Sequence, residues 1–293
     1  MLARGAVLRD DFPVSFLARC RHLDALLAAI NQELDGILSR RQFRHRLSES
    51  RCLFAGQYRV FANYLRTLGQ TQAPRPRARY IPRIGVATSE RRGSPVSGDR
   101  GASFRTAQGM HYILLCDGMG SGEEARQEST ACVMLLRGLL TAGFSPADAL
   151  QLLNSVYLLR DDGAFATVDL LQIDLVGGAL TLFKWGSAPS FLKHGDTLQK
   201  IETALPPPGL EGTGKAESFA LSLEEGEMLV LLSDGAEGRE TEEKIRTFGG
   251  RSPKRLASEI LQQLQQAEDD RTAVVLRLQS VSSRRQNTTL CRS

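Results

Sequence analysis

Residues 112–129 read YILLCDGMGSGEEARQES, and this stretch decides how the chain is expected to fold. Its first five residues, Tyr112–Cys116, form a short apolar run that is typical of a buried strand. Asp117 and three glycines follow, and glycines allow backbone angles and close approaches that other residues resist. Ser121 and Glu124 then have the spacing of a capping box ahead of an amphipathic run. The stretch therefore predicts a strand, a glycine-rich loop carrying a carboxylate, and a helix.

Two further acidic groups stand at strand ends elsewhere in the chain. A second apolar strand runs straight into Asp234, and the pair Asp269 and Asp270 comes just before the apolar strand at 272–278. Asp99 is a fourth candidate. If the last strand is antiparallel to the other two, its start meets their ends and the carboxylates converge. One Asp-Gly after a strand usually marks a turn, but this combination favours a carboxylate-rich metal site.

These motifs resemble the metal-dependent PP2C-type serine/threonine phosphatases, and more narrowly the SpoIIE branch, the bacterial sporulation phosphatase and its relatives. The matching sequence motifs, in order, are SGD at 97–99, DGMGSGEEARQES at 117–129, SDGAEG at 233–238 and DDRTAVVLRL at 269–278. The resemblance covers roughly residues 81–279. It implies an α+β fold, an αββα sandwich of two antiparallel sheets flanked by helices, preceded by an N-terminal helical, coiled-coil-like segment.

The resemblance also implies two divalent cations, Mn²⁺ or Mg²⁺, and a set of ligands. The implied metal ligands are Asp99, Asp117, Gly118 through its carbonyl, Asp234 and Asp269, and the four aspartates are the implied catalytic residues. Asp117 would bridge the two cations, while Asp99 would act directly or through water. Asp270 is the neighbouring alternative to Asp269, and spacing leaves that choice open. Lys184 resembles a lysine of the branch, and we expect its side chain to reach solvent. Arg271 stands where the branch commonly has methionine; its side chain either binds phosphate or points to solvent, and we favour solvent.

The residue types support hydrolysis with an activated water. A phosphomonoester dianion repels a hydroxide nucleophile, and two divalent cations can neutralise charge and lower the pKa of a water. Oxygen ligands suit Mg²⁺ and Mn²⁺. The four histidines and five cysteines show no triad or ligand spacing, which argues against nucleophilic Cys or Ser chemistry. The cysteines are instead expected to be reduced thiols in a cytoplasmic protein, with the soluble part of a membrane-anchored parent as the alternative.

The chain divides by composition. Residues 1–72 carry apolar stripes at 16–37 and 47–68 with heptad-like spacing, which predict two helical segments. The resemblance implies that they form a regulatory or dimerisation segment, and a purely structural helical hairpin is the alternative. A proline-containing linker at 73–79, a phosphatase domain at 80–279 and a disordered tail at 280–293 follow. The first 92 residues hold 17 Arg against 7 Asp or Glu. We interpret this basic surface as a solvated helical face and expect no nucleic-acid partner.

Local patterns predict the rest of the domain. Residues 90–105 are expected to be irregular, and strands at 218–223 and 227–232 to form a hairpin. Helices are expected to start at Ser145-Pro146 and at Ser252-Pro253. No apolar run is long enough to span a bilayer.

The leading interpretation is a protein serine/threonine phosphatase that acts on a phosphorylated regulator resembling an anti-anti-sigma factor. Its N-terminal helices would regulate it, with homodimerisation through those helices as an option. The alternative is a catalytically silent pseudophosphatase that serves as a dimeric scaffold. A nucleotide-binding module is disfavoured, because neither a Walker lysine nor Rossmann spacing is present.

Overall fold

A computed structural model describes residues 6–17, 20–34, 58, 61–62, 65, 77–106, 108–160, 163–210, 214–262 and 269–281. The chain separates into two compact units, Met1–Arg59 and Val60–Ser293. The second unit contains every strand of the described part.

The second unit is built on two five-stranded sheets in which all neighbouring strands are antiparallel. The first sheet has the order β1 (Tyr80–Ser89), β10 (Arg271–Ser280), β9 (Met228–Leu232), β6 (Ser190–His194) and β7 (Thr197–Ile201). The second has the order β2 (Asp99–Arg105), β3 (Met110–Gly118), β4 (Ala166–Asp174), β5 (Leu180–Trp185) and β8 (Glu217–Leu221).

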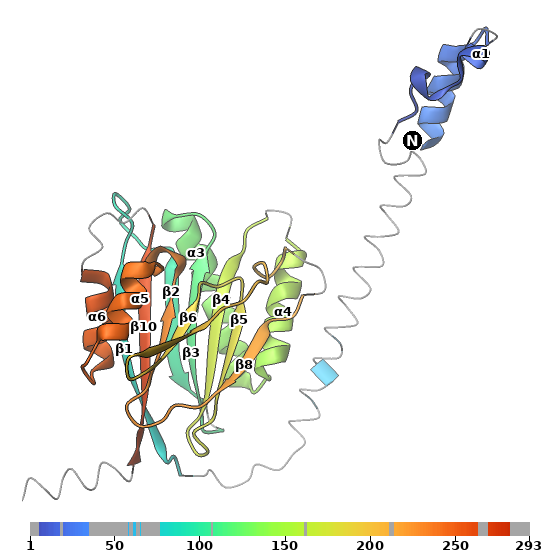
Figure 1. The fold of residues 1–293 in the computed structure, drawn as a ribbon. Helices are drawn as coiled ribbons and strands as arrows, with labels where there is room; N and C mark the ends of the chain where they lie inside the picture. Colours follow the sequence, from blue (N-terminus) through green and yellow to red (C-terminus); the bar gives the residue numbers. More distant parts are fainter. Residues whose placement is uncertain are drawn as a thin grey trace, which may run out of the picture. The chain divides into compact units, whose positions relative to one another are not determined.

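Helices cover the outer face of each sheet (Figure 1). Helices α3 (Gly122–Ala142) and α4 (Pro146–Leu158) pack on the sheet that contains β3, and α5 (Arg239–Thr247) and α6 (Pro253–Gln262) pack on the sheet that contains β9. A third apolar cluster lies between the sheets and includes Ile113, Leu171 and Leu229. The predicted αββα sandwich of the α+β class is therefore confirmed.

The N-terminal unit is only partly described. Its helical residues are Val14–Leu17 and 23–34, so a turn at Arg21 and His22 interrupts the single helix that the stripe at 16–37 predicts. The Asn31 side chain accepts from the Val7 amide at 2.7 Å and donates to the Val7 carbonyl at 3.0 Å, which ties the preceding segment onto the second helix.

Most of the stripe at 47–68, residues 71–76 of the predicted linker and residues 282–293 of the predicted tail lie outside the described residues. Of that stripe, Phe61 is described, and its ring meets the Phe144 ring edge-on at 6.4 Å between centroids. No helix in the described ranges is both long and apolar enough to cross a membrane.

Two local predictions for the domain are wrong, and burial explains the first. Strands β8 and β9 do not form a hairpin, because β8 pairs with β5 while β9 lies between β10 and β6 in the other sheet. All five residues of β9 are buried, as a central strand requires, whereas β8 is largely exposed at its sheet's edge. Residues 99–105, expected to be irregular, form strand β2.

The helix starts follow the predicted signals in part. Ser145 caps α4 by accepting from the Asp148 amide at 3.2 Å, with Pro146 in the first turn. The capping box at Ser121 is wrong, because Ser121 makes no capping bond to α3. Helix α5 was not predicted.

Candidate metal centre

The predicted carboxylates come from four strand ends at one edge of the sandwich. Asp99 begins β2 and is directly opposite Asp117, the penultimate residue of β3. Asp234 follows β9, and Asp269 precedes β10, which runs antiparallel to β9. The predicted meeting of strand start and strand ends is therefore present, with the ligand candidates divided equally between the two sheets.

Backbone packing holds the Asp234 and Asp269 segments together. The Ser233 amide donates to the Thr272 carbonyl at 3.0 Å, and the Thr272 amide donates to the Ser233 hydroxyl at 2.8 Å. A Cβ on Gly235 would lie 2.2 Å from the Asp270 carbonyl oxygen, so only glycine permits this approach. The acidic loop after β9 is thus packed against the acidic pair before β10.

The pKa values of Asp99, Asp117 and Asp269 are all raised above the ordinary value of an aspartate. Burial, followed by the negative charges of Asp99, Asp234 and Asp269, raises the pKa of Asp117 to about 9. The pKa of Asp99 is also raised, mainly by burial, while the nearby hydroxyls of Ser233 and Thr272 act in the opposite direction. Partly buried carboxylates whose negative charges repel one another attract cations.

Asp99 provides a test of whether this edge suits a metal ion. Its side chain is 3% exposed, and both carboxylate oxygens are buried without a hydrogen-bond partner among the residues that the structure describes. A buried carboxylate normally has its lone pairs satisfied. Carboxylate and carbonyl oxygens are the donors that hard divalent cations prefer. The donor set therefore fits Mg²⁺ or Mn²⁺.

The cluster is looser than a closed metal cage. Within the described ranges, no group of three or more His, Cys, Asp or Glu side chains is already arranged to hold a metal ion. Like charges repel, so four carboxylates are expected to stand apart until a cation draws them together.

Asp269 and Asp270 occupy different environments. Asp270 is 3% exposed, and its two oxygens accept from the Arg91 amide at 2.8 Å and the Gly98 amide at 2.7 Å. Asp269 is exposed, and one of its oxygens accepts from the Asp270 amide at 2.8 Å. Asp270 thus anchors the loop that leads to Asp99, whereas Asp269 is exposed beside it.

The glycine-rich loop brings helix α3 unusually close to the end of β3. A Cβ on Gly118 would lie 2.0 Å from the Ala125 carbonyl oxygen, so glycine is required by this contact. Gly120 has a φ of +88°, in the left-handed region that favours glycine, as the sequence predicted. Ser121 accepts from the Arg91 guanidinium at 3.1 Å instead of capping α3. The metal loop, α3 and the β1–β2 loop are therefore one connected unit.

Lys184 and Arg271 are both buried, contrary to prediction. Lys184 is 0% exposed and Arg271 is 6% exposed. Strand β5 is covered by the opposing sheet, and β10 is a central strand, so neither side chain begins at a free edge. The Arg271 guanidinium donates to the Ser89 hydroxyl on β1 at 3.3 Å.

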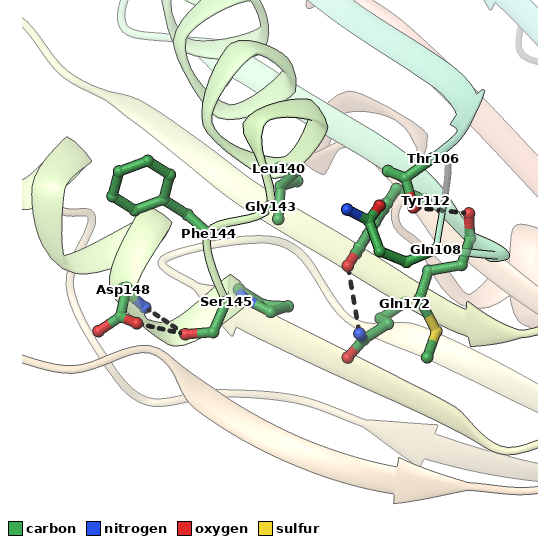
Figure 2. Close-up of a pocket in the computed structure, with 11 residues that line it drawn as sticks. Thr106, Gln108, Tyr112, Leu140, Gly143, Phe144, Ser145, Asp148 and Gln172 are labelled. Atoms are coloured by element: carbon green, nitrogen blue, oxygen red, sulfur yellow. Dashed lines mark hydrogen bonds between the residues drawn. The ribbon is translucent and has the colours of Figure 1, made fainter. Parts of the chain in front are cut away.

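A separate cavity of about 280 Å³ lies at the opposite end of β3 from Asp117. Figure 2 shows it between the start of β3 and the α3–α4 connection, where the Gln172 amide donates to the Tyr112 hydroxyl at 3.2 Å. It has no part of the acidic cluster in its lining. The cavity and the candidate metal centre are thus distinct features of the domain.

Comparison with known proteins agrees with the fold and the motif order. A family model described as stage II sporulation protein E (SpoIIE) matches residues 108–279. Stage II sporulation protein E of Priestia megaterium is 32% identical over 215 residues, and that of Bacillus subtilis (strain 168) is 31% identical over 209 residues. These alignments cover 68% and 66% of this chain but only 37% and 25% of the relatives, so the chain spans well under half of their length.

Solved structures place the match in the phosphatase part of those relatives. The PP2C phosphatase domain of Bacillus subtilis SpoIIE with a fragment of its regulatory domain is 29% identical, with a TM-score of 0.64 over 70% of this chain and 65% of that chain. The SpoIIE phosphatase domain in a crystal form without domain swapping is 28% identical, with a TM-score of 0.54 over 70% and 96%.

RsbX in complex with magnesium shares the fold at 16% identity, with a TM-score of 0.55 over 72% of this chain and 100% of that chain. The sandwich, the motif order and these matches agree with one another. The chain belongs to the stage II sporulation protein E family and contains its PP2C-type serine/threonine phosphatase domain.

Proposed function

We propose that the protein is a metal-dependent phosphatase that hydrolyses phosphoserine or phosphothreonine on a regulatory protein. The observation that carries the proposal is the convergence of Asp99 and Asp117 from one sheet with Asp234 and Asp269 from the other. Family membership supports the reaction class. Two Mg²⁺ or Mn²⁺ ions, when bound, would neutralise the substrate phosphate and supply an activated water.

The residues divide the work of holding those ions. Asp117 would hold the cations together with the carbonyl oxygen of Gly118, and the charges of the three other aspartates act on its pKa. Asp234 and Asp269 would hold a cation from the other sheet. Asp99 contributes its two buried, unpartnered oxygens, directly or through water.

We assign Asp269 and not Asp270 as the ligand. Both oxygens of Asp270 already accept hydrogen bonds from backbone amides of the β1–β2 loop. If Asp270 bound a cation instead, these hydrogen bonds to the loop would be lost. Asp269 is exposed at the open edge and makes one such bond. Asp270 instead positions Asp99 by tethering Gly98 beside it.

The site opens outward in a way that suits a protein substrate. Asp99 is buried, Asp117 is half-buried, and Asp234 and Asp269 are exposed. A phosphorylated side chain on a folded partner can reach such a shallow edge without entering a deep pocket. On family grounds we propose that the partner is a cytoplasmic phosphoprotein resembling an anti-anti-sigma factor.

Regulation by the N-terminal helices, including dimerisation through them, is part of the proposal. The support is the edge-on contact of Phe61 with Phe144, which follows α3 directly. Because α3 begins at the metal loop, a force on its far end can reach Gly118 through the helix and its contact with Ala125.

The test is hydrolysis of a phosphoserine peptide and an aryl phosphate by wild type and Asp117→Asn, in EDTA, Mg²⁺ or Mn²⁺. We expect turnover that needs the metal and that falls by at least about a hundredfold in the variant. Folded wild type without turnover in any metal would reject the phosphatase proposal in favour of the silent scaffold. The chain from Tyr80 onward, assayed alongside, separates that result from inhibition by the N-terminal segment.

A further inference from the structure

A fully buried lysine lies between the two sheets near the acidic edge. Lys184 is 0% exposed and Asp169 is 1% exposed, and the ammonium donates to one Asp169 carboxylate oxygen at 2.7 Å. The same ammonium donates to the Ala188 carbonyl at 2.7 Å and to the Ser190 hydroxyl at 2.9 Å. An ammonium has three N–H groups, so all of them have a partner.

These partners belong to different sheets. Lys184 lies on β5 and Asp169 on β4, whereas Ser190 is the first residue of β6 in the other sheet. Side chains two residues apart on a strand share a face. Leu182 and Leu171 belong to the apolar cluster between the sheets, so Lys184 and Asp169 face the same interior. One ammonium thus links the two layers of the sandwich.

The link lies at the end of the sandwich that carries the acidic cluster. Asp169 is directly opposite Leu115, two residues before Asp117, a span of about 7 Å along the strand. Phe191 is opposite Val230, so Ser190 lies toward the end of β9 that leads to Asp234. The lysine therefore bonds to one strand on each side of the boundary that divides the candidate ligands.

We propose that Lys184, with Asp169 and Ser190, is a positioning cluster that sets the separation between the two halves of the metal centre. This inference rests on the proposed function. Asp117 and Asp234 belong to different sheets, so the distance between them depends on how the layers are held at this end. Apolar contacts resist separation but allow sliding, whereas three directed hydrogen bonds from one atom define a position.

Stability alone does not account for the charged pair. Removing a lysine and a carboxylate from water costs several kcal/mol, and well-packed apolar residues in their place are often as stabilising. The Ser187 hydroxyl donates, at 2.7 Å, to the same Asp169 oxygen that accepts from Lys184. The cluster is thus built with more directed bonds than an apolar layer needs, at the level where the ligand-bearing strands end.

The test removes the bond to the other sheet and leaves the ion pair intact. Lys184→Met would leave Asp169 buried without its cation and is at risk of not folding, so Ser190→Ala is the variant to use. The matched control is Ser187→Ala, which removes a hydroxyl from the same carboxylate without touching β6. Mn²⁺ binding is followed by the loss of the free-ion electron paramagnetic resonance signal, and backbone exchange at 117–118 and 234–236 by hydrogen–deuterium exchange.

We expect Ser190→Ala to bind Mn²⁺ at least about tenfold more weakly than wild type, with activity recovered at high Mn²⁺. Exchange at both segments should rise, while Ser187→Ala stays close to wild type. Equal Mn²⁺ affinity in wild type and Ser190→Ala would overturn the inference. If wild type binds no Mn²⁺, the metal-centre proposal fails. The exchange data then decide separately, because equal exchange in the two serine variants rejects the cluster's positioning role.

Discussion

Asp117→Asn should stabilise the metal-free protein while abolishing its response to metal. In the metal-free protein, burial of the Asp117 side chain and the negative charges of Asp99, Asp234 and Asp269 raise its pKa to about 9. In an unfolded chain an aspartate titrates near pKa 3.9. Asparagine has the shape of the neutral acid and does not release a proton on unfolding.

The magnitude follows from proton linkage. Because the folded pKa is raised, the folded state holds a proton that the unfolded state releases, so stability falls as pH rises from about 4 toward 9. Each pH unit costs up to about 1.4 kcal/mol, or about 4 kcal/mol by pH 7. The repulsion is distributed over four carboxylates. We therefore expect one substitution to recover about half of this lost free energy of unfolding. About 2 kcal/mol corresponds to a Tm about 4–8 °C higher for a domain of this size.

The assay is thermal unfolding of wild type and Asp117→Asn in EDTA at about pH 5, 6 and 7.5, repeated with Mn²⁺. The difference in Tm between Asp117→Asn and wild type should be small at the lowest pH and should increase as pH rises. Added Mn²⁺ should stabilise wild type and leave the variant nearly unchanged. A variant that is no more stable than wild type in EDTA near pH 7.5, or a gap that is independent of pH, would refute the reasoning.

Three other predictions follow from individual contacts. Gly118→Ala should cost about 1–3 kcal/mol in a denaturant titration, because its Cβ meets backbone at 2.0 Å, while Gly138→Ala, with open space in mid-helix, should gain up to about 1 kcal/mol. Asp270→Asn should lower the Tm in EDTA by releasing its loop, whereas Asp269→Asn should keep the Tm and weaken Mn²⁺ binding in a calorimetric titration; the reverse pattern would contradict the ligand assignment. Phe61→Ala should change turnover per folded molecule in the aryl phosphate assay, and a loss of stability alone would argue against control by the N-terminal segment.

Short-range patterns were enough to place most of the elements. The apolar run before Asp117 predicted β3, and the run before Asp234 predicted β9, because a buried strand needs consecutive apolar residues and its exit needs turn residues. Ser145-Pro146 located the start of α4, since capping depends on residues within one turn. The order of the motifs pointed to the family before any contact was known.

Those local patterns could not predict which strands pair or which distant residues bond to one another. Strands β8 and β9 lie in different sheets because they pair with different strands, and those partners are distant in the sequence. The choice between Asp269 and Asp270 rests on amides from Arg91 and Gly98, about 180 residues away in the chain.

Burial of polar side chains was likewise decided by the tertiary structure. Ser121 has the spacing of a capping residue, yet the guanidinium of Arg91 occupies its hydroxyl. Lys184 lies near the end of an apolar strand, where sequence predicts a solvated side chain, yet the opposing sheet encloses it and Ser190 of that sheet accepts one of its hydrogen bonds. Sequence determined which carboxylates stand at strand ends, because that is a local property. Only the stacking of two sheets decided that they face one another, because the distance between layers depends on every side chain packed between them.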